Sequence, residues 1–143
     1  MIAQINIFTL VDVIGALATG KLTDNIYMTD NRRGSRTSGL GTGTLTSDVT
    51  YTQVLNWHVM AIDLQADVQI NKITFYRNGL PITVADTPCA RLQQYGAPSG
   101  RYWAGVINYP TLIEAGNYQY LIEFDIGKKL MLMEKFATLS VNA

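Results

Sequence analysis

The chain has 143 residues, a length at which one domain buries roughly two thirds of its unfolded surface and needs no disulfide or metal to fold. Hydrophobic residues make up 48% of it and aromatic residues 10%, which excludes a disordered or collagen-like chain. Eleven basic residues balance eleven acidic ones, so no broad basic surface is available for nucleic acid or anionic lipid, and weak charge repulsion favours self-association.

The N-terminal segment lacks the positively charged n-region of a secretory signal. Apolar residues follow Met1 without a preceding positive charge, and the first cation is Lys21. No window reaches the roughly 18 uncharged apolar residues that a membrane-spanning helix requires. We therefore expect a cytoplasmic protein without a membrane span, and export by a route without a cleaved signal stays open as an alternative.

Apolar and polar residues alternate along most of the chain, with turn residues between the segments, which is typical of β-strands. This alternation predicts strands at residues 5–10, 26–28, 53–63, 68–76, 101–107, 118–126, 130–134 and 136–141, and residues 80–84 fit the start of a return strand after the turn at Asn78-Gly79. Residues 11–19 fit either extended chain or a short helix, and residues 88–98 are predicted to be irregular. In residues 34–50, 12 of 17 are Gly, Ser or Thr, which indicates a long loop or a loop with a weak edge strand.

About eight strands with mostly short connections, and no helical pattern longer than about two turns, indicate an all-β fold. We predict one domain over residues 1–143, folded as an antiparallel β-sandwich that is jelly-roll-like. A closed barrel is the alternative, because side-chain periodicity does not separate the two.

A repeated tripeptide supplies the first candidate binding residues. Asp24-Asn25 and Asp30-Asn31 each follow a threonine, six residues apart. Two aspartates at that spacing in a straight strand lie about 20 Å apart, too far to share one calcium ion. Turn residues that bracket a strand explain the repeat better, although their oxygens could also bind sugar hydroxyls or a partner.

The two tryptophans differ in their predicted surroundings. Trp57 shares a strand face with Leu55 and Val59, which predicts packing in the core. Trp103 alternates with Arg101, and its face stays undecided; exposed, it could stack on the apolar face of a sugar. The candidate ligand-binding residues are therefore Asp24, Asn25, Asp30, Asn31, Arg101 and Trp103.

No catalytic residue, cofactor or metal site is predicted. One Cys and one His cannot form a disulfide or a structural zinc site within the chain. His58 lies on the polar face of its strand, Cys89 has no features of a nucleophile, and Glu123 and Asp125 fit a solvated strand face. An enzyme that uses His58 with Asp63, or the two acidic residues, ranks third among the hypotheses.

Residues 130–133 (LMLM) alternate two residue types in one predicted strand. Either both leucines or both methionines must point outward, because successive side chains of a strand point to opposite faces. Exposed methionines make an adaptable contact surface. Another strand or another subunit could equally cover this segment, so we keep self-association to a homo-oligomer as a hypothesis.

Seven segments carry a family resemblance, at residues 5–12 (INIFTLVD), 15–18 (GALA), 24–27 (DNIY), 29–31 (TDN), 53–57 (QVLNW), 62–63 (ID) and 102–105 (YWAG). Together they resemble the PixA/AidA inclusion-body protein family of Gram-negative bacteria. The resemblance implies a cytoplasmic protein that accumulates in inclusion bodies, as PixA-like members do, or a quorum-sensing-regulated protein linked to virulence, as AidA-like members are. Some PixA-like members are methionine-rich, whereas five methionines here argue against methionine storage.

The leading hypothesis is a non-enzymatic, self-associating bacterial protein of the inclusion-body or AidA type. The alternative is a lectin-like protein, in which Asp and Asn side chains bind sugar hydroxyls and an aromatic ring stacks on the sugar. The family resemblance supplies no catalytic residues.

Overall fold

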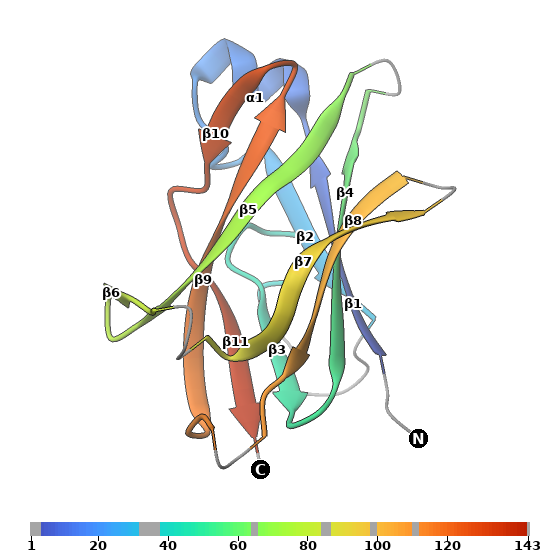
Figure 1. The fold of residues 1–143 in the computed structure, drawn as a ribbon. Coiled ribbons are helices and arrows are strands. Elements are labelled where there is room, and N and C mark those ends of the chain that lie inside the picture. Colours follow the sequence, from blue (N-terminus) through green and yellow to red (C-terminus); the bar gives the residue numbers. More distant parts are fainter. Residues whose placement is uncertain are drawn as a thin grey trace.

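Two stacked β-sheets enclose one hydrophobic core in the computed structural model, which describes residues 4–31, 38–63, 66–83, 87–97, 100–109 and 112–142 (Figure 1). The five-stranded sheet contains, in spatial order, β2 (Ile26–Asp30), β1 (Gln4–Val11), β4 (Val54–Ala61), β8 (Gly100–Ile107) and β7 (Cys89–Ala97). The six-stranded sheet contains β3 (Thr46–Thr50), β11 (Ala137–Asn142), β9 (Gly116–Ile126), β5 (Val68–Arg77) and β6 (Leu80–Pro81), and β10 (Lys129–Leu132) also pairs with β9.

The expected all-β sandwich is confirmed, with two sheets rather than a closed barrel. The purely antiparallel arrangement is wrong, because β1 pairs with β4, and β3 with β11, in parallel. Alternation reports which side chains share a face but not the direction of the neighbouring strand. In the first parallel pair, β4 reaches β1 only after the chain has passed through a helix, β2 and β3.

The described residues contain eleven strands, more than the eight or so predicted. The irregular structure predicted for residues 88–98 is wrong, because most of that segment forms β7. A bulge between Ala90 and Gln93, where Arg91 has a φ of 56°, interrupts the alternation of this strand and hides it in the sequence. β3 ends the Gly/Ser/Thr-rich segment, of which residues 32–37 lie outside the described part.

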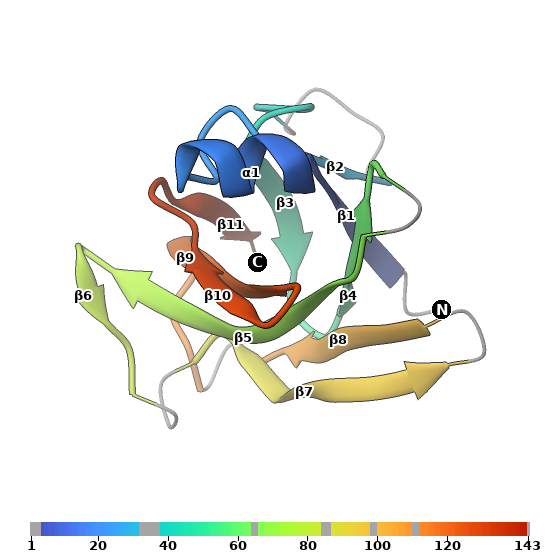
Figure 2. The same cartoon turned by 90° about the horizontal axis from the view of Figure 1, so that it is seen from above.

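The segment that fitted either extended chain or a helix contains the end of β1 and then α1 (Val13–Thr19), which lies across one end of the sandwich (Figures 1 and 2). Asp12 caps the helix, since its Oδ1 accepts a hydrogen bond of 3.0 Å from the Gly15 nitrogen. Gly20 ends it in the left-handed region, at a φ of 73°. Among the described residues, no helix is long and apolar enough to cross a membrane.

Three aromatic rings tie the sheets together in the core. Trp57 of β4 contacts Phe75 of β5 and Tyr120 of β9 edge-on, with ring centroids 6.3 Å and 5.8 Å apart. Trp57 and Tyr120 are completely buried, so the predicted core position of Trp57 is confirmed. Each such ring removes a large apolar area from water, which makes this cluster a main source of stability.

Candidate functional site

Four aromatic rings stack in a row across the outer face of the five-stranded sheet, and we call this row the aromatic ladder. Phe8 of β1 stacks on His58 of β4 with centroids 4.9 Å apart and planes 17° apart. His58 stacks in turn on Tyr102 of β8 at 5.4 Å and 22°, and Tyr102 on Tyr95 of β7 at 5.8 Å and 24°. Register explains the row, because Phe8 lies opposite His58 and Tyr95 opposite Tyr102.

The outward side chains of β1 and β4 beside the ladder carry no charge, whereas Asp67 and Arg101 lie next to it in the hollow described below. The outward residues that flank it on the inner strands are polar amides at one end, where Asn56 Nδ2 donates to Asn6 Oδ1 at 3.0 Å. At the other end they are apolar, where Leu10 and Met60 lie opposite each other and are 41% and 61% exposed. Exposed apolar side chains with no charge among them, such as Leu10 and Met60, are typical of a contact surface.

A hollow opens beside the ladder, where the sheet divides. β8 pairs with β4 only from Val54 to Trp57, and beyond that point the two strands separate. The hollow in this fork has a volume of about 680 Å³, and we call it the fork hollow. Its lining includes the ladder residues Phe8, His58 and Tyr102, the apolar residues Leu10, Met60 and Val68, and the polar residues Asp67, Gln69 and Arg101.

Burial gives His58 a lowered pKa. The imidazole lies between two rings, and loss of water around it lowers its pKa below the ordinary 6.5. His58 is therefore uncharged at neutral pH. The one titratable group of the ladder near neutrality thus adds no charge to this face.

The lowered pKa of His58 makes stability depend on pH. Because the unfolded chain binds the proton more tightly, the free energy of unfolding is highest above 6.5 and falls as the pH drops through 6.5 toward the folded pKa. We expect wild type to lose more stability than His58→Gln between about pH 7.5 and about pH 5.5. Urea unfolding of both proteins at the two pH values measures this, and equal losses would contradict it.

Asp24 and Asn25, two of the predicted binding residues, lie in the turn after α1. The Asn25 amide is used locally, since Nδ2 donates to Thr19 Oγ1 at 3.2 Å and to the carbonyl of Lys21 at 3.0 Å. Asp24 has a φ of 66° and lines a small hollow of about 250 Å³ beside Glu134. Asn25 therefore closes a turn, as the turn interpretation predicts, and Asp24 keeps an accessible carboxylate.

Asp30 and Asn31 lie at the end of β2. Asn31 Oδ1 accepts from the Asn6 nitrogen at 2.8 Å and its Nδ2 donates to the Gln4 carbonyl at 3.2 Å, which prolongs the pairing of β1 with β2. Asp30 accepts a hydrogen bond of 2.6 Å from Ser47 Oγ of β3. Both side chains thus hold strands together at a sheet edge.

Arg101 and Trp103 point to different parts of the molecule. Arg101 lines the fork hollow, where its Nη1 donates to Gln69 Oε1 at 3.3 Å. Trp103 is half-buried, donates from Nε1 to the Ile70 carbonyl at 3.0 Å, and lines a separate hollow of about 630 Å³ between β5 and β7. The structure therefore does not bring the six predicted residues together in one site. The aromatic side chain that lies beside Arg101 in the fork hollow is Tyr102.

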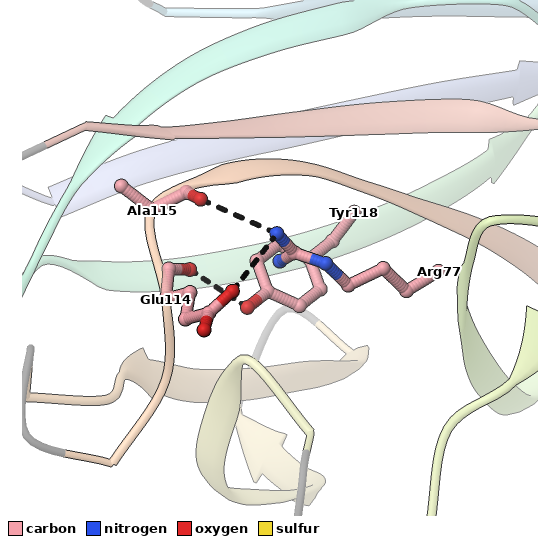
Figure 3. Close-up of polar contacts among 4 residues, drawn as sticks. All are labelled: Arg77, Glu114, Ala115 and Tyr118. Carbon is pink, nitrogen blue, oxygen red and sulfur yellow. Dashed lines mark hydrogen bonds and ion pairs between the residues drawn. The ribbon is translucent and has the colours of Figure 1, made fainter.

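A cluster that the sequence did not reveal surrounds Arg77, at the end of β5 (Figure 3). Its guanidinium lies 4.4 Å from the ring centre of Tyr118, and Nη2 donates to the Ala115 carbonyl at 3.4 Å and lies 3.8 Å from Glu114 Oε2. The Tyr118 hydroxyl donates to the Glu114 carbonyl at 2.7 Å, and burial raises its pKa, an effect that Arg77 partly offsets. These groups hold the turn before β9 against β5, so we assign them a structural role.

Comparison with known proteins gives a family and a fold. The family described as "Domain of unknown function (DUF8788)" matches residues 3–131. The chain belongs to this family. Among curated proteins, none matches its sequence.

Among solved structures, the crystal structure of an inclusion body protein (PixA) from Burkholderia cenocepacia J2315 has the same fold as this DUF8788 member, with a TM-score of 0.69. The alignment covers 99% of this chain and 95% of the other, at 12% sequence identity. The resemblance to PixA proteins seen in the sequence is thus confirmed at the level of the fold.

The remaining sequence candidates for chemistry have local partners in this DUF8788 chain. Glu123 accepts from Asn71 Nδ2 at 2.6 Å, and Asp125 accepts from the Lys128 nitrogen at 3.0 Å, both on half-buried positions of β9. Cys89 is fully buried, and burial raises the pKa of its thiol far above neutrality, which keeps it protonated. In the described part of the chain, no three His, Cys, Asp or Glu side chains gather as they would around a metal ion.

In the segment of alternating leucine and methionine, the leucines are the residues that point outward. Met131 and Met133 are buried, whereas Leu130 and Leu132 are 56% and 45% exposed. The flexible methionine side chains therefore fill the core, and the outward surface of β10 is made by leucine.

Proposed function

We propose that this DUF8788 member is a non-enzymatic, cytoplasmic bacterial protein that self-associates, as an inclusion-body protein must, and that copies join through the free edge of β7. The exposed edge of this one long strand carries the proposal. Roles in virulence and quorum sensing stay predictions from the sequence resemblance.

The outer edges of β2, β3 and β6 are protected. The Met28 nitrogen of β2 donates to the Thr42 carbonyl at 3.2 Å, and the Gly41 nitrogen donates back to the Met28 carbonyl at 2.7 Å. Ser38 exchanges two backbone hydrogen bonds with Thr46 of β3. β6 has only two residues, and the second is Pro81, which has no N–H to offer. These are the usual devices that prevent sheets from pairing edge to edge.

The edge of β5 beyond β6 is protected in another way. It faces the five-stranded sheet, where the Ile70 carbonyl accepts its hydrogen bond from Trp103 Nε1. A second chain therefore has no access to that backbone without displacing a half-buried tryptophan.

β7 has no proline and, among the described residues, no covering segment, and its bulge and single charge lie near its start, between Ala90 and Gln93. It has nine residues and pairs with β8 on one side, and in the described part of the chain no strand pairs with its other side. Figure 2 shows β7 (yellow) as the outermost strand of its sheet. Arg91 at the bulge is its only charged residue, and Gln93 and Gln94 follow. A long edge with so little charge is a template for a strand of another copy.

The charge distribution supports the same surface. Two β7 strands related by a two-fold axis would join two five-stranded sheets into one continuous sheet, in which Arg91 is the one charged residue of each paired strand. The net charge of zero removes most long-range repulsion between copies. The PixA crystal structure with the same fold is described as that of an inclusion body protein, a description that fits a protein whose copies associate.

Sedimentation equilibrium over a concentration series near pH 6.5, the calculated isoelectric point, tests the proposal. Wild type is expected to form dimers or larger species. Gln94→Lys, which adds a cation to the exposed edge, is expected to weaken association at least about tenfold. Ala18→Lys adds the same charge on the exposed surface of α1 and is expected to associate as wild type does. A strictly monomeric wild type at high concentration would overturn the proposal.

The lectin-like alternative has less support from the geometry. Asp24, Arg101 and Trp103 line three different hollows, and Asn25 and Asn31 use their amides to bind backbone groups. Self-association is therefore the function that we propose. A glycan array, with and without calcium, checks the alternative directly.

A further inference from the structure

The fork hollow contains two opposite charges that do not neutralise each other. Arg101 and Asp67 both line it and both side chains are exposed. No ion pair joins them to each other or to another described residue. The hollow therefore presents one positive and one negative group, each available to a bound molecule.

The guanidinium of Arg101 is held in place by a neutral neighbour. Its Nη1 donates to Gln69 Oε1 at 3.3 Å, a contact that orients the group without cancelling its charge. Guanidinium offers five donors in a planar fork, so donors remain for a carboxylate, which it binds with two parallel hydrogen bonds.

Asp67 is positioned by its backbone. Its carbonyl accepts a hydrogen bond of 3.2 Å from the Gly127 nitrogen, which holds the start of β5 beside the turn after β9. The side-chain carboxylate of Asp67 faces the hollow, where it can accept charge-assisted hydrogen bonds from an ammonium group.

Apart from Thr9, the rest of the lining is apolar and aromatic. Phe8, His58 and Tyr102 contribute rings, and Leu10, Met60 and Val68 contribute aliphatic side chains. The lowered pKa of His58 keeps its ring uncharged at neutral pH, so no third charge enters the hollow. The volume of about 680 Å³ lies within the range of small-molecule sites.

We propose that the fork hollow binds a small zwitterion with an apolar side group, of the chemical class of an aromatic α-amino acid. The carboxylate of this ligand binds Arg101, its ammonium group binds Asp67, and its apolar group packs against the ladder. Asp67 would repel a simple anion, and Arg101 would repel a simple cation.

A sugar fits this site poorly. Sugars stack on exposed ring faces, whereas both faces of His58 are covered by Phe8 and Tyr102, and Tyr95 covers the other face of Tyr102. The inner rings of the ladder therefore present edges to the hollow. The site goes beyond the self-association proposed above, because its charged residues do not belong to β7.

Isothermal titration calorimetry with three matched probes tests the assignment. L-tryptophan carries both charges, N-acetyl-L-tryptophan lacks the ammonium, and L-tryptophanamide lacks the carboxylate. Wild type is expected to bind L-tryptophan at least about tenfold more tightly than either derivative. Arg101→Met should bind L-tryptophan and the amide equally, and Asp67→Asn should bind L-tryptophan and the N-acetyl derivative equally.

Lys21→Met, which removes an exposed positive charge outside both the fork hollow and β7, is the control and should bind as wild type does. The proposal is overturned if L-tryptophan does not bind at millimolar concentration, if the derivatives bind as tightly as L-tryptophan, or if the Lys21 variant loses as much affinity as the two hollow variants. Binding of neutral saccharides in place of the zwitterion would overturn it too. Both hollow variants should sediment as wild type does, so this proposal and the proposed association fail or hold separately.

Discussion

Trp57→Ala is expected to lower the free energy of unfolding by about 3–5 kcal/mol. Trp57 is fully buried between the sheets and touches Phe75 and Tyr120, so truncation leaves a cavity that these rigid neighbours fill only in part. Small domains have a total stability of about 5–15 kcal/mol, and the variant thus loses a large share of it. Urea unfolding followed by far-ultraviolet circular dichroism measures the change.

Trp103→Ala is the matched control for this prediction. Trp103 is half-buried and loses one hydrogen bond to Ile70, so we expect about half the cost of the Trp57 substitution. Equal costs at the two positions would show that the core is not centred on Trp57.

Gly39→Ala is expected to destabilise the protein by about 2–3 kcal/mol. Gly39 has a φ of 73°, and a β-carbon there would lie 2.5 Å from the carbonyl oxygen of Thr44. Backbone must therefore shift in the segment that covers the edges of β2 and β3. Chemical denaturation gives the free energy of unfolding.

Gly41→Ala separates the steric effect from the conformational one. Gly41 has a similar φ of 79°, but no atom lies within 4 Å of its added β-carbon. We expect a cost of about 1 kcal/mol, the ordinary penalty for a left-handed alanine. If both alanine variants lower the free energy of unfolding equally, the close approach to Thr44 does not contribute to the cost.

The side-chain alternation predicted much of the fold because burial acts on each strand separately. In β4, Leu55 and Trp57 point into the core and His58 and Met60 point out, as the pattern indicated. Strand direction and neighbours depend on the path of the chain between sheets, which no local pattern reports. β7 escaped prediction for a different reason, since a bulge shifts its alternation in the middle.

The candidate site was harder to predict because it depends on register. Phe8, His58, Tyr102 and Tyr95 come from four strands, and only the pairing of those strands aligns their rings. An available signal was an aromatic residue on the outward side of a strand, as Phe8 is between the buried Ile7 and Thr9. The fork hollow needed the divergence of β8 from β4, which the sequence does not encode locally.

The asparagines show why residue type alone misleads. Asn25 and Asn31 carry oxygen and nitrogen atoms that suit a sugar, yet both amides bind backbone groups nearby. Such local hydrogen bonds are the commonest use of asparagine in turns and at strand ends. The first copy of the tripeptide thus lies in the turn before β2, the second copy joins β2 to its neighbours at the other end, and Asp24 lines a small hollow.

Amide hydrogen exchange, measured by NMR on dilute and concentrated samples near pH 6.5, tests the role of the β7 edge most directly. On concentration, the backbone amides of β7 that point away from β8 are expected to exchange more slowly, while amides of the covered strands β2 and β3 keep their rates. Unchanged exchange in β7 together with slower exchange on another surface of an associated sample would contradict the account.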